Sequence, residues 1–178
     1  GRASGSAATD INIPDTVTSN EITYSVTTIA DSAFSSNALI SVTIADSVTT
    51  IGNQAFAFNN ALASVTIGSS VNTIGDQAFA FNNTLTSLTI SDSVTTIGDQ
   101  AFAFNNTLTS LTIGSSVTTI GARAFYDNDL SSLTIGNSVE TIGNEAFWNN
   151  TSLTSLTISD SVTTVGDKAF GSNTSLTS

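Results

Sequence analysis

The chain of 178 residues contains no cysteine, no histidine and no methionine, and only one proline and three cationic side chains. The absence of cysteine excludes disulfide bonds, thiolate metal sites and thiol nucleophiles. Three cations against fourteen acids give a net charge of −11, which repels nucleic acid and anionic membrane surfaces. No apolar run is long enough to cross a bilayer. The sequence therefore predicts no nucleic-acid partner and no membrane insertion.

What the chain has in abundance is an internal repeat. The phrase from Thr73 to Ile90 recurs letter for letter from Thr96 to Ile113, and looser copies cover almost all of the remaining sequence. A valine opens each copy, and consecutive valines are 22 or 23 residues apart: Val26, Val48, Val71, Val94, Val117, Val139 and Val162. A fixed period of this length indicates a solenoid of stacked coils rather than a globular domain with one cleft.

Each copy has a constant apolar frame. In the fourth copy, the segment Leu108-x-x-Leu-x-Ile alternates as a short strand with one buried face does. Gly98 follows the Val-x-x-Ile pair and recurs in most copies, which predicts a tight corner with positive φ. The Ala101-Phe102 pair fits a single helical turn or an irregular stretch, with the phenylalanine filling the coil.

These residues resemble the BspA-like leucine-rich repeat family of bacterial and protist surface proteins. The family's motif, Val-x-x-Ile-Gly-x-x-Ala-Phe-x-x-Cys-x-x-Leu-x-x-Ile-x-Ile-Pro, is similar to all seven copies, the last of them truncated. Asparagine replaces the family's cysteine in every copy, and its proline survives only as Pro14. The resemblance implies a mainly β, right-handed solenoid with a parallel concave sheet of about seven short strands and an irregular or single-turn convex side. It also implies adhesion or protein recognition at a cell surface.

The repeat also divides the chain. Residues 1–9 are predicted to be a disordered linker or a cloning remnant, and residues 10–178 a single solenoid. Within residues 10–25 we expect a strand and a hairpin that caps the open end, because polar Ser19, Asn20 and Glu21 separate β-favouring residues. The repeats begin near residues 25, 47, 70, 93, 116, 138 and 161. The last coil is truncated and uncapped, so it is expected either to fray after about Asp160 or to self-associate.

One asparagine recurs in every copy: Asn37, Asn59, Asn82, Asn105, Asn128, Asn150 and Asn173. Such a column is either a polar binding stripe or an internal ladder. An amide carries two donors and an acceptor, which suits it to satisfy backbone groups of neighbouring coils. We therefore favour the internal ladder.

Two other columns of equivalent residues, one aromatic and one acidic, can also be interpreted either as binding sites or as structural features. The residues just beyond the core phenylalanine are aromatic in five copies: Phe58, Phe81, Phe104, Tyr126 and Trp148. Stacked one coil apart, they form either a partner site or a packed flank, and packing is favoured. Acids follow the corner glycine or alanine in four copies, as Asp31, Asp76, Asp99 and Asp167, with Asn53, Ala122 and Asn144 between them. Single acids with gaps favour a solvated edge over a calcium site.

Hydroxyl side chains fill the outward positions of the predicted strands. They are Ser41, Thr43, Ser64, Thr66, Ser87, Thr89, Ser110, Thr112, Ser132, Thr134, Ser155 and Thr157. This double column is either the ligand-binding face or a consequence of the preference of threonine for exposed strand positions. We predict that it binds the ligand of a secreted or cell-surface adhesin, which is an extracellular protein or glycan.

The same hydroxyl array supports an alternative function. Neighbouring strands lie about 4.8 Å apart and outward residues of one strand about 6.7 Å apart, a lattice similar to that of solenoid ice-binding or surface-templating proteins. Catalysis has little support, because Asp127 and Asp129 are close only within a loop and no serine lies beside a base. We therefore expect no enzyme activity, no cofactor and no metal.

Overall fold

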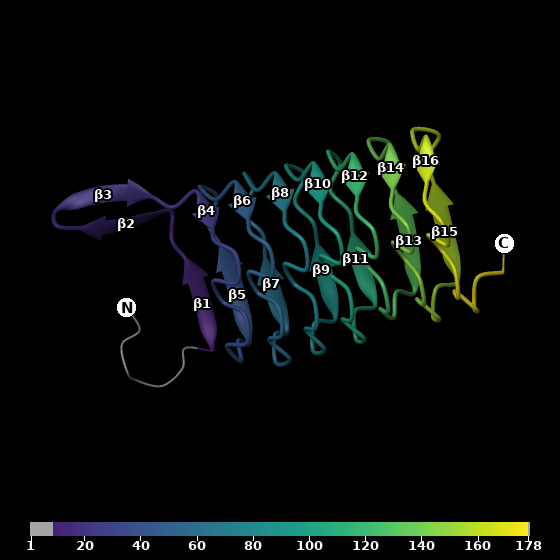
Figure 1. Ribbon diagram of the computed structural model, residues 1–178, viewed down its shortest axis with the longest axis horizontal. Helices are drawn as coiled ribbons and strands as arrows, with labels where there is room; N and C mark the ends of the chain where they lie inside the picture. Colours follow the sequence, from purple (N-terminus) through teal and green to yellow (C-terminus); the bar gives the residue numbers. More distant parts are fainter. Residues whose placement is uncertain (1–8, 178) are drawn as a thin grey trace.

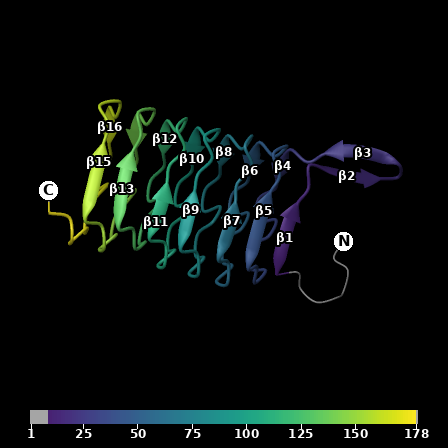
Figure 2. The same ribbon diagram turned by 180° about the vertical axis from the view of Figure 1, so that it is seen from behind.

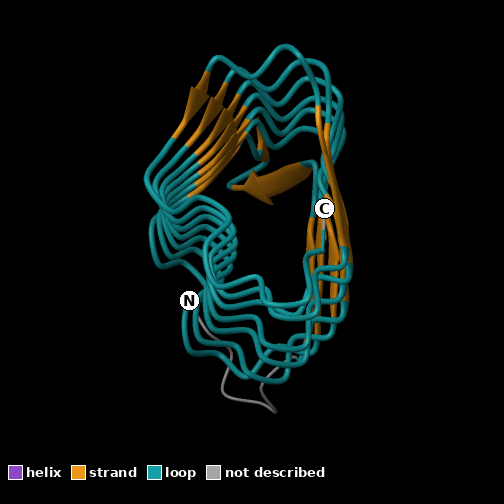
Figure 3. Ribbon diagram, turned by 90° about the vertical axis from the view of Figure 1, so that its right-hand side faces the viewer, coloured by secondary structure: helices purple, strands orange, loops and turns teal. Residues whose placement is uncertain are grey.

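The computed structural model describes residues 9–177, so the predicted linker at residues 1–9 lies, except for Thr9, outside the described residues. The described chain is a solenoid of stacked coils built from strands and turns, with no helix between residues 9 and 177 (Figure 1). Seen along the stack in Figure 3, each coil is a flattened ring with strands on two different walls. The predicted mainly β solenoid with parallel strands is confirmed.

The predicted Leu-x-x-Leu-x-Ile strands form one wall, here called the long-strand face. Its members are β1 (Asp10–Ile13), β5 (Ser41–Ile44), β7 (Ser64–Thr66), β9 (Ser87–Thr89), β11 (Ser110–Thr112), β13 (Ser132–Ile135) and β15 (Ser155–Ile158). The strands are parallel and pair like with like, as Leu111 with Leu88. Hydrogen-bonded pairing groups them as β1-β5-β7, β9-β11 and β13-β15, so the sheet is interrupted after β7 and after β11.

A second parallel sheet, which the sequence pattern did not predict, forms the other wall. This short-strand sheet contains β4 (Thr28–Ile29), β6 (Thr50–Ile51), β8 (Thr73–Ile74), β10 (Thr96–Ile97), β12 (Thr119–Ile120), β14 (Thr141–Ile142) and β16 (Thr164–Val165). It is continuous from β4 to β16. Two residues are too few to show strand alternation in a sequence, which is why these strands were not recognised.

The core consists of columns that run along the solenoid, each built from one position of the repeat. One column is a stack of seven phenylalanine rings, with centroids 5.1–5.4 Å apart and planes within 12° of parallel: Phe34, Phe56, Phe79, Phe102, Phe125, Phe147 and Phe170. The five inner rings are fully buried. Each of them packs between rings of adjacent coils, so the core of one coil is completed by its neighbours.

The corner glycine is required for a different reason from the predicted one. No glycine among the described residues has positive φ, so the prediction of a left-handed corner is wrong. A Cβ added at Gly98 would instead lie 2.6 Å from Oδ1 of Asp76 and 2.7 Å from the carbonyl carbon of Gly75. Glycine is needed here because successive coils approach too closely for a side chain.

Left-handed backbone occurs in the turn around the core phenylalanine. In the third copy φ is 55° at Gln77 and 61° at Phe81. The N–H of Gln77 donates to the carbonyl of Asp99 at 2.8 Å, and the N–H of Phe81 donates to that of Ala103 at 3.0 Å. This wall is therefore irregular, as predicted, but it is held by hydrogen bonds between coils.

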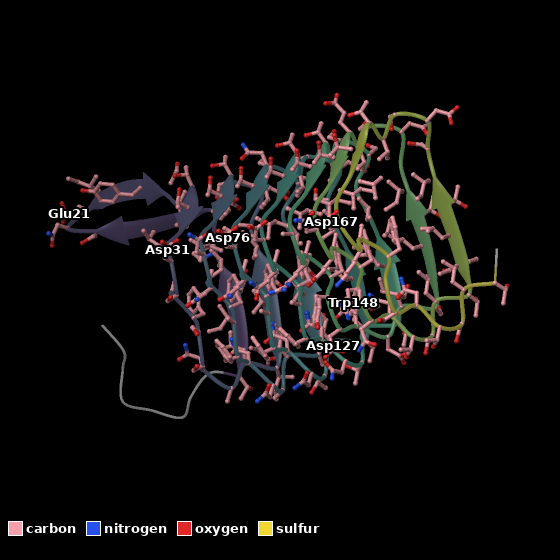
Figure 4. All side chains as sticks on the ribbon, turned by 45° about the vertical axis from the view of Figure 1, so that its right-hand side comes forward. Glu21, Asp31, Asp76, Asp127, Trp148 and Asp167 are labelled. Carbon is pink, nitrogen blue, oxygen red and sulfur yellow. The ribbon has the colours of Figure 1, made fainter. Side chains whose placement is uncertain are left out.

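A hairpin extends from the N-terminal end of the stack along its long axis (Figures 1 and 2). It joins β2 (Thr16–Ser19) to β3 (Ile22–Ser25) in antiparallel register, through Asn20 and Glu21 with φ of 49° and 67°. Glu21 marks its tip in Figure 4. Val17, Ile22 and Tyr24 are 48–55% exposed. These apolar side chains lie in solvent rather than over the end of the core.

The last described coil is also exposed on its outer side. Ile158 and Val165, whose counterparts Ile135 and Ile142 are buried, are 40% and 52% exposed. Fraying of this coil, or self-association through it, stays a prediction.

Candidate binding face and groove

The asparagine column lies inside the solenoid. Asn59, Asn82, Asn105, Asn128 and Asn150 are at most 5% exposed, and Asn173 is 9% exposed. Oδ1 of Asn105 accepts the N–H of Asn82 at 2.7 Å, while its Nδ2 donates to the carbonyls of Phe79 and Phe102 at 3.1 and 2.8 Å. Each amide therefore joins its own turn to the preceding coil, and these side chains are not available to a ligand.

The aromatic flank is packed largely against itself. Phe58, Phe81 and Phe104 stack with centroids 4.7 and 4.6 Å apart, and Tyr126 tilts against Phe104 at 5.4 Å. Because the rings stack along the solenoid, they cover one another's faces and present mainly their edges. Phe58, at the N-terminal end of the stack, is the most open of these rings, with 45% exposure.

Trp148 ends the flank in a different way. A Cβ added at Gly171, the equivalent position in the next coil, would lie 2.3 Å from a carbon of the indole ring, so glycine makes room for this side chain. Nζ of Lys168 lies 5.5 Å from the ring centroid, within cation–π range. The tryptophan is therefore packed against the last coil and is not a separate platform.

The acidic column lies along one exposed edge, where Asp31, Asp76 and Asp167 are labelled in Figure 4. Oδ1 of Asp76 accepts the N–H of Asp99 in the next coil at 2.8 Å. Asn53 makes the same bond to the N–H of Asp76. In these coils the position uses a side-chain acceptor rather than a charge, and Ala122 shows that a coil also forms without one. No three acids gather as a metal site within the described part of the chain.

The double column of hydroxyls covers the long-strand face. All twelve predicted residues lie on its strands, and eleven are exposed; Ser41 is half-buried and donates to Oδ1 of Asp10 at 2.6 Å. Paired strands hold equivalent residues side by side, as Thr112 beside Thr89. The face is polar, rigidly spaced and open to solvent.

A groove with a volume of about 620 Å³ opens in this face between β7 and β9. This is within the usual range of about 300–1,000 Å³ for ligand pockets. Hydroxyls of both hydroxyl columns line it: Ser64, Thr66, Ser87, Thr89 and Thr112. Half-buried Val65 and Ile67 form its floor. Asp46 and Asp92, which follow β5 and β9, lie at one end.

The residues that follow the strands alternate in size beside the groove. The residue that follows the strand isoleucine is Ala45, Gly68, Ser91 and Gly114 in consecutive coils. A Cβ at Gly68 would lie 2.3 Å from the carbonyl oxygen of Ala45, and one at Gly114 would lie 2.2 Å from that of Ser91. Glycine permits this close approach at Gly68 and Gly114. It does not by itself decide strand pairing, because β13 is followed by Gly136 and does not pair with β11, whereas β15 is followed by Ser159 and pairs with β13. The groove was not predicted, because the interruption of strand pairing between β7 and β9 has no counterpart in the repeat pattern.

The two carboxylates of the groove remain charged at neutral pH. Oδ1 of Asp46 accepts the backbone N–H of Ser69 at 2.6 Å, and Oδ1 of Asp92 accepts that of Ser115 at 2.7 Å. Because these bonds favour the ionised form, the pKa of each carboxyl lies below its ordinary value. The described cations, Arg123 and Lys168, lie elsewhere, on the aromatic flank. The groove is therefore an anionic site.

Known proteins match both the repeat and the fold. Residues 5–103 and 80–178 match the sequence profile of the BspA type leucine rich repeat region. The chain belongs to the BspA-type leucine-rich repeat family. No curated protein matches the sequence. Among the residues described, no helix has the length and apolar character needed to span a membrane.

Solved structures of several bacterial proteins, most of them described as leucine-rich repeat proteins, are similar to this chain. A leucine-rich repeat protein of T. pallidum is 22% identical, with a TM-score of 0.87 over 96% of this chain and 79% of that one, which shows the fold. A leucine-rich cell surface protein of Faecalibacterium prausnitzii is 30% identical, with a TM-score of 0.61 over 83% of this chain and 47% of that one. The pneumococcal vaccine antigen PcpA is 19% identical, with a TM-score of 0.62 over 99% of this chain and 61% of that one.

Proposed function

We propose that this BspA-type chain is a non-enzymatic, adhesin-type binding module of a secreted or cell-surface protein, and that it recognises a protein or glycan through the long-strand face. The observation that carries the proposal is the exposed double column of hydroxyls with a groove opening in it. Membership of the family supports it. The description of the Faecalibacterium prausnitzii relative as a cell surface protein supports the location.

The geometry of the face suits recognition rather than chemistry. Its hydroxyls stand on strands fixed by hydrogen bonds on at least one side, so little conformational freedom is lost when a ligand binds. Serine and threonine each offer a donor and an acceptor, which match the polar groups of a protein backbone or a sugar. The face therefore binds by hydrogen bonding and shape.

A pair of double variants tests this function. Thr89→Lys with Thr112→Lys places two long cations on neighbouring strands of the face, and Asn83→Lys with Asn106→Lys places the same charges on exposed turn residues one coil apart. On arrays of extracellular proteins and glycans, we expect the first variant to lose the binding of the native chain and the second to retain it. Equal binding by both variants, with unchanged far-UV circular dichroism, would exclude the long-strand face.

An ice-binding or surface-templating solenoid is the second candidate. Parallel register within each pair, as between Ser110 and Ser87, favours it because equivalent hydroxyls repeat at the strand spacing. The two interruptions of the sheet oppose it, because they divide the array that a flat crystal would have to match. Measurements of thermal hysteresis and of ice recrystallisation distinguish the two candidates. We expect neither activity, and a thermal hysteresis that rises with protein concentration would favour the ice-binding function over the adhesin.

A further inference from the structure

The groove between β7 and β9 combines two features that select a particular ligand chemistry. Its floor is apolar, from Val65 and Ile67, while the carboxylates of Asp46 and Asp92 lie at one end. An acceptor-only carboxylate attracts a donor that carries positive charge. An apolar floor next to such an anion suits a side chain with a methylene stem and a charged head.

Other ligand classes fit this groove less well. An anionic group would be repelled by the two carboxylates and by a net charge of −11. A neutral sugar usually stacks a ring face on an aromatic platform, and the groove lining contains no aromatic residue. The stacked rings of Phe58, Phe81 and Phe104 lie on a different wall of the coil and cover one another's faces.

We propose that this groove binds a lysine- or arginine-bearing segment of a protein partner, with the stem of the basic side chain over Val65 and Ile67 and its charged head between Asp46 and Asp92. The inference rests on the proposed function, because it names the ligand chemistry of the same face. The volume of about 620 Å³ is larger than one side chain, so the neighbouring residues of an extended segment also fit. Their backbone groups meet the hydroxyls of Thr66, Thr89 and Thr112.

Charge also determines how such a partner arrives. The chain has a net charge of −11, and its described cations lie outside the groove. It therefore attracts a basic partner from a distance and orients it toward an anionic site. Binding therefore weakens as ionic strength rises, because salt screens partly exposed charges.

Neutral variants that preserve the fold can be made at both carboxylates. Asp46→Asn with Asp92→Asn removes the two charges and keeps the oxygen that accepts the N–H of Ser69 or Ser115. The sixth coil already holds asparagine at this position of the repeat, as Asn137. The matched control is Asp76→Asn with Asp99→Asn on the exposed edge, where Asn53 already fills the same role. Both double variants change the net charge by the same amount.

The experiment is an NMR titration of methyl-labelled protein with the peptide acetyl-Gly-Lys-Gly-Lys-Gly-amide. A second peptide with both lysines acetylated has the same stems without the charges, and maltohexaose serves as a neutral oligosaccharide. We expect the lysine peptide to shift the methyl signals of Val65, Ile67 and Ile90 in a saturable way. Neutralising the exposed carboxylates of Asp46 and Asp92 should weaken the binding of the lysine peptide about tenfold, as expected for two solvent-exposed ion pairs. The control variant should bind the lysine peptide with native affinity. The acetylated peptide should cause no saturable shift in the native protein.

Four results would overturn the inference. Equal weakening in both double variants would show a general effect of net charge. Equal shifts with the acetylated peptide would remove the role of the carboxylates, and shifts with maltohexaose alone would assign the groove to a glycan. If the lysine peptide does not bind while the Thr89→Lys, Thr112→Lys variant still loses array binding, the groove inference fails and the proposed function stands.

Discussion

Single asparagine and aspartate side chains connect the coils of this solenoid. The buried asparagines and the exposed column at the corner both present an oxygen to a backbone N–H of an adjacent coil, as Asn105 does for Asn82 and Asp76 for Asp99. The buried column is always asparagine, because its amide also donates to two carbonyls. The exposed column holds either residue, because only the acceptor is used, and Ala122 interrupts it.

The buried amide should contribute measurably to stability. Asn105→Ala would leave the N–H of Asn82 and the carbonyls of Phe79 and Phe102 without this partner inside the protein. We expect the free energy of unfolding in urea to fall by about 1–3 kcal/mol. The exposed neighbour provides the control, since Asn106→Ala should change stability by less than about 0.5 kcal/mol. Equal effects of the two substitutions would contradict the assigned role of the column.

The groove carboxylates should titrate at unusually low pH. The folded-state pKa of Asp46 and Asp92 is lowered by the N–H donors of Ser69 and Ser115. The stabilisation from these bonds is therefore fully present above the unfolded pKa, near 3.8, and is lost as pH falls through the lower folded value. We expect the amide nitrogen shifts of Ser69 and Ser115 to titrate with midpoints below 3.8, and that of Ser69 to become flat in Asp46→Asn. Midpoints above 3.8 would refute the assignment.

At the scale of the coil, close approach between backbones decides which residues are tolerated. Gly98→Ala would bring a Cβ within 2.6–2.8 Å of Asp76 and Gly75, so the coils must move apart. We expect a loss of about 1–3 kcal/mol, the usual range for overpacking. Gly136→Ala is the matched test, because nothing lies within 4 Å of its added Cβ and its φ is not positive. It should be neutral or stabilise by up to about 1 kcal/mol. Thermal unfolding of both variants measures the difference, and equal melting temperatures would refute it.

Features that depend on one repeat could be predicted from the sequence, whereas features that depend on differences between repeats could not. The long strands follow from the alternation in segments such as Leu108-x-x-Leu-x-Ile. The reason for the corner glycine was predicted wrongly, because close approach to Gly75 and Asp76 exists only between stacked coils. The groove lies where β7 and β9 do not pair, an interruption that appears only when coils are stacked.

At the scale of the whole molecule, stability should be distributed over nearly equivalent coils. Deleting residues 73–95 joins Asn72 to Thr96, and the phrase from Thr96 to Ile113 is identical to the one removed from Thr73 to Ile90. We expect the shortened chain to fold with an unchanged circular dichroism signal per residue. Its urea m-value should fall by about a seventh, in proportion to the surface buried. A non-cooperative transition or a loss of β signal would show that the coils are not interchangeable.

The two interruptions of the long-strand face, after β7 and after β11, are two coils apart. That separation is about 10 Å at the spacing of strands, or three residues of an extended chain. The two sites differ in charge: Asp46 and Asp92 line the groove at the first interruption, whereas uncharged Ser115 and Asn137 follow the strands on either side of the second. A ligand that contacted both sites would form its second contact at the high local concentration set by the first, so that weak individual contacts add up to avidity. Such a ligand would carry unlike groups about three residues apart, a positive charge for the first site and a neutral polar group for the second.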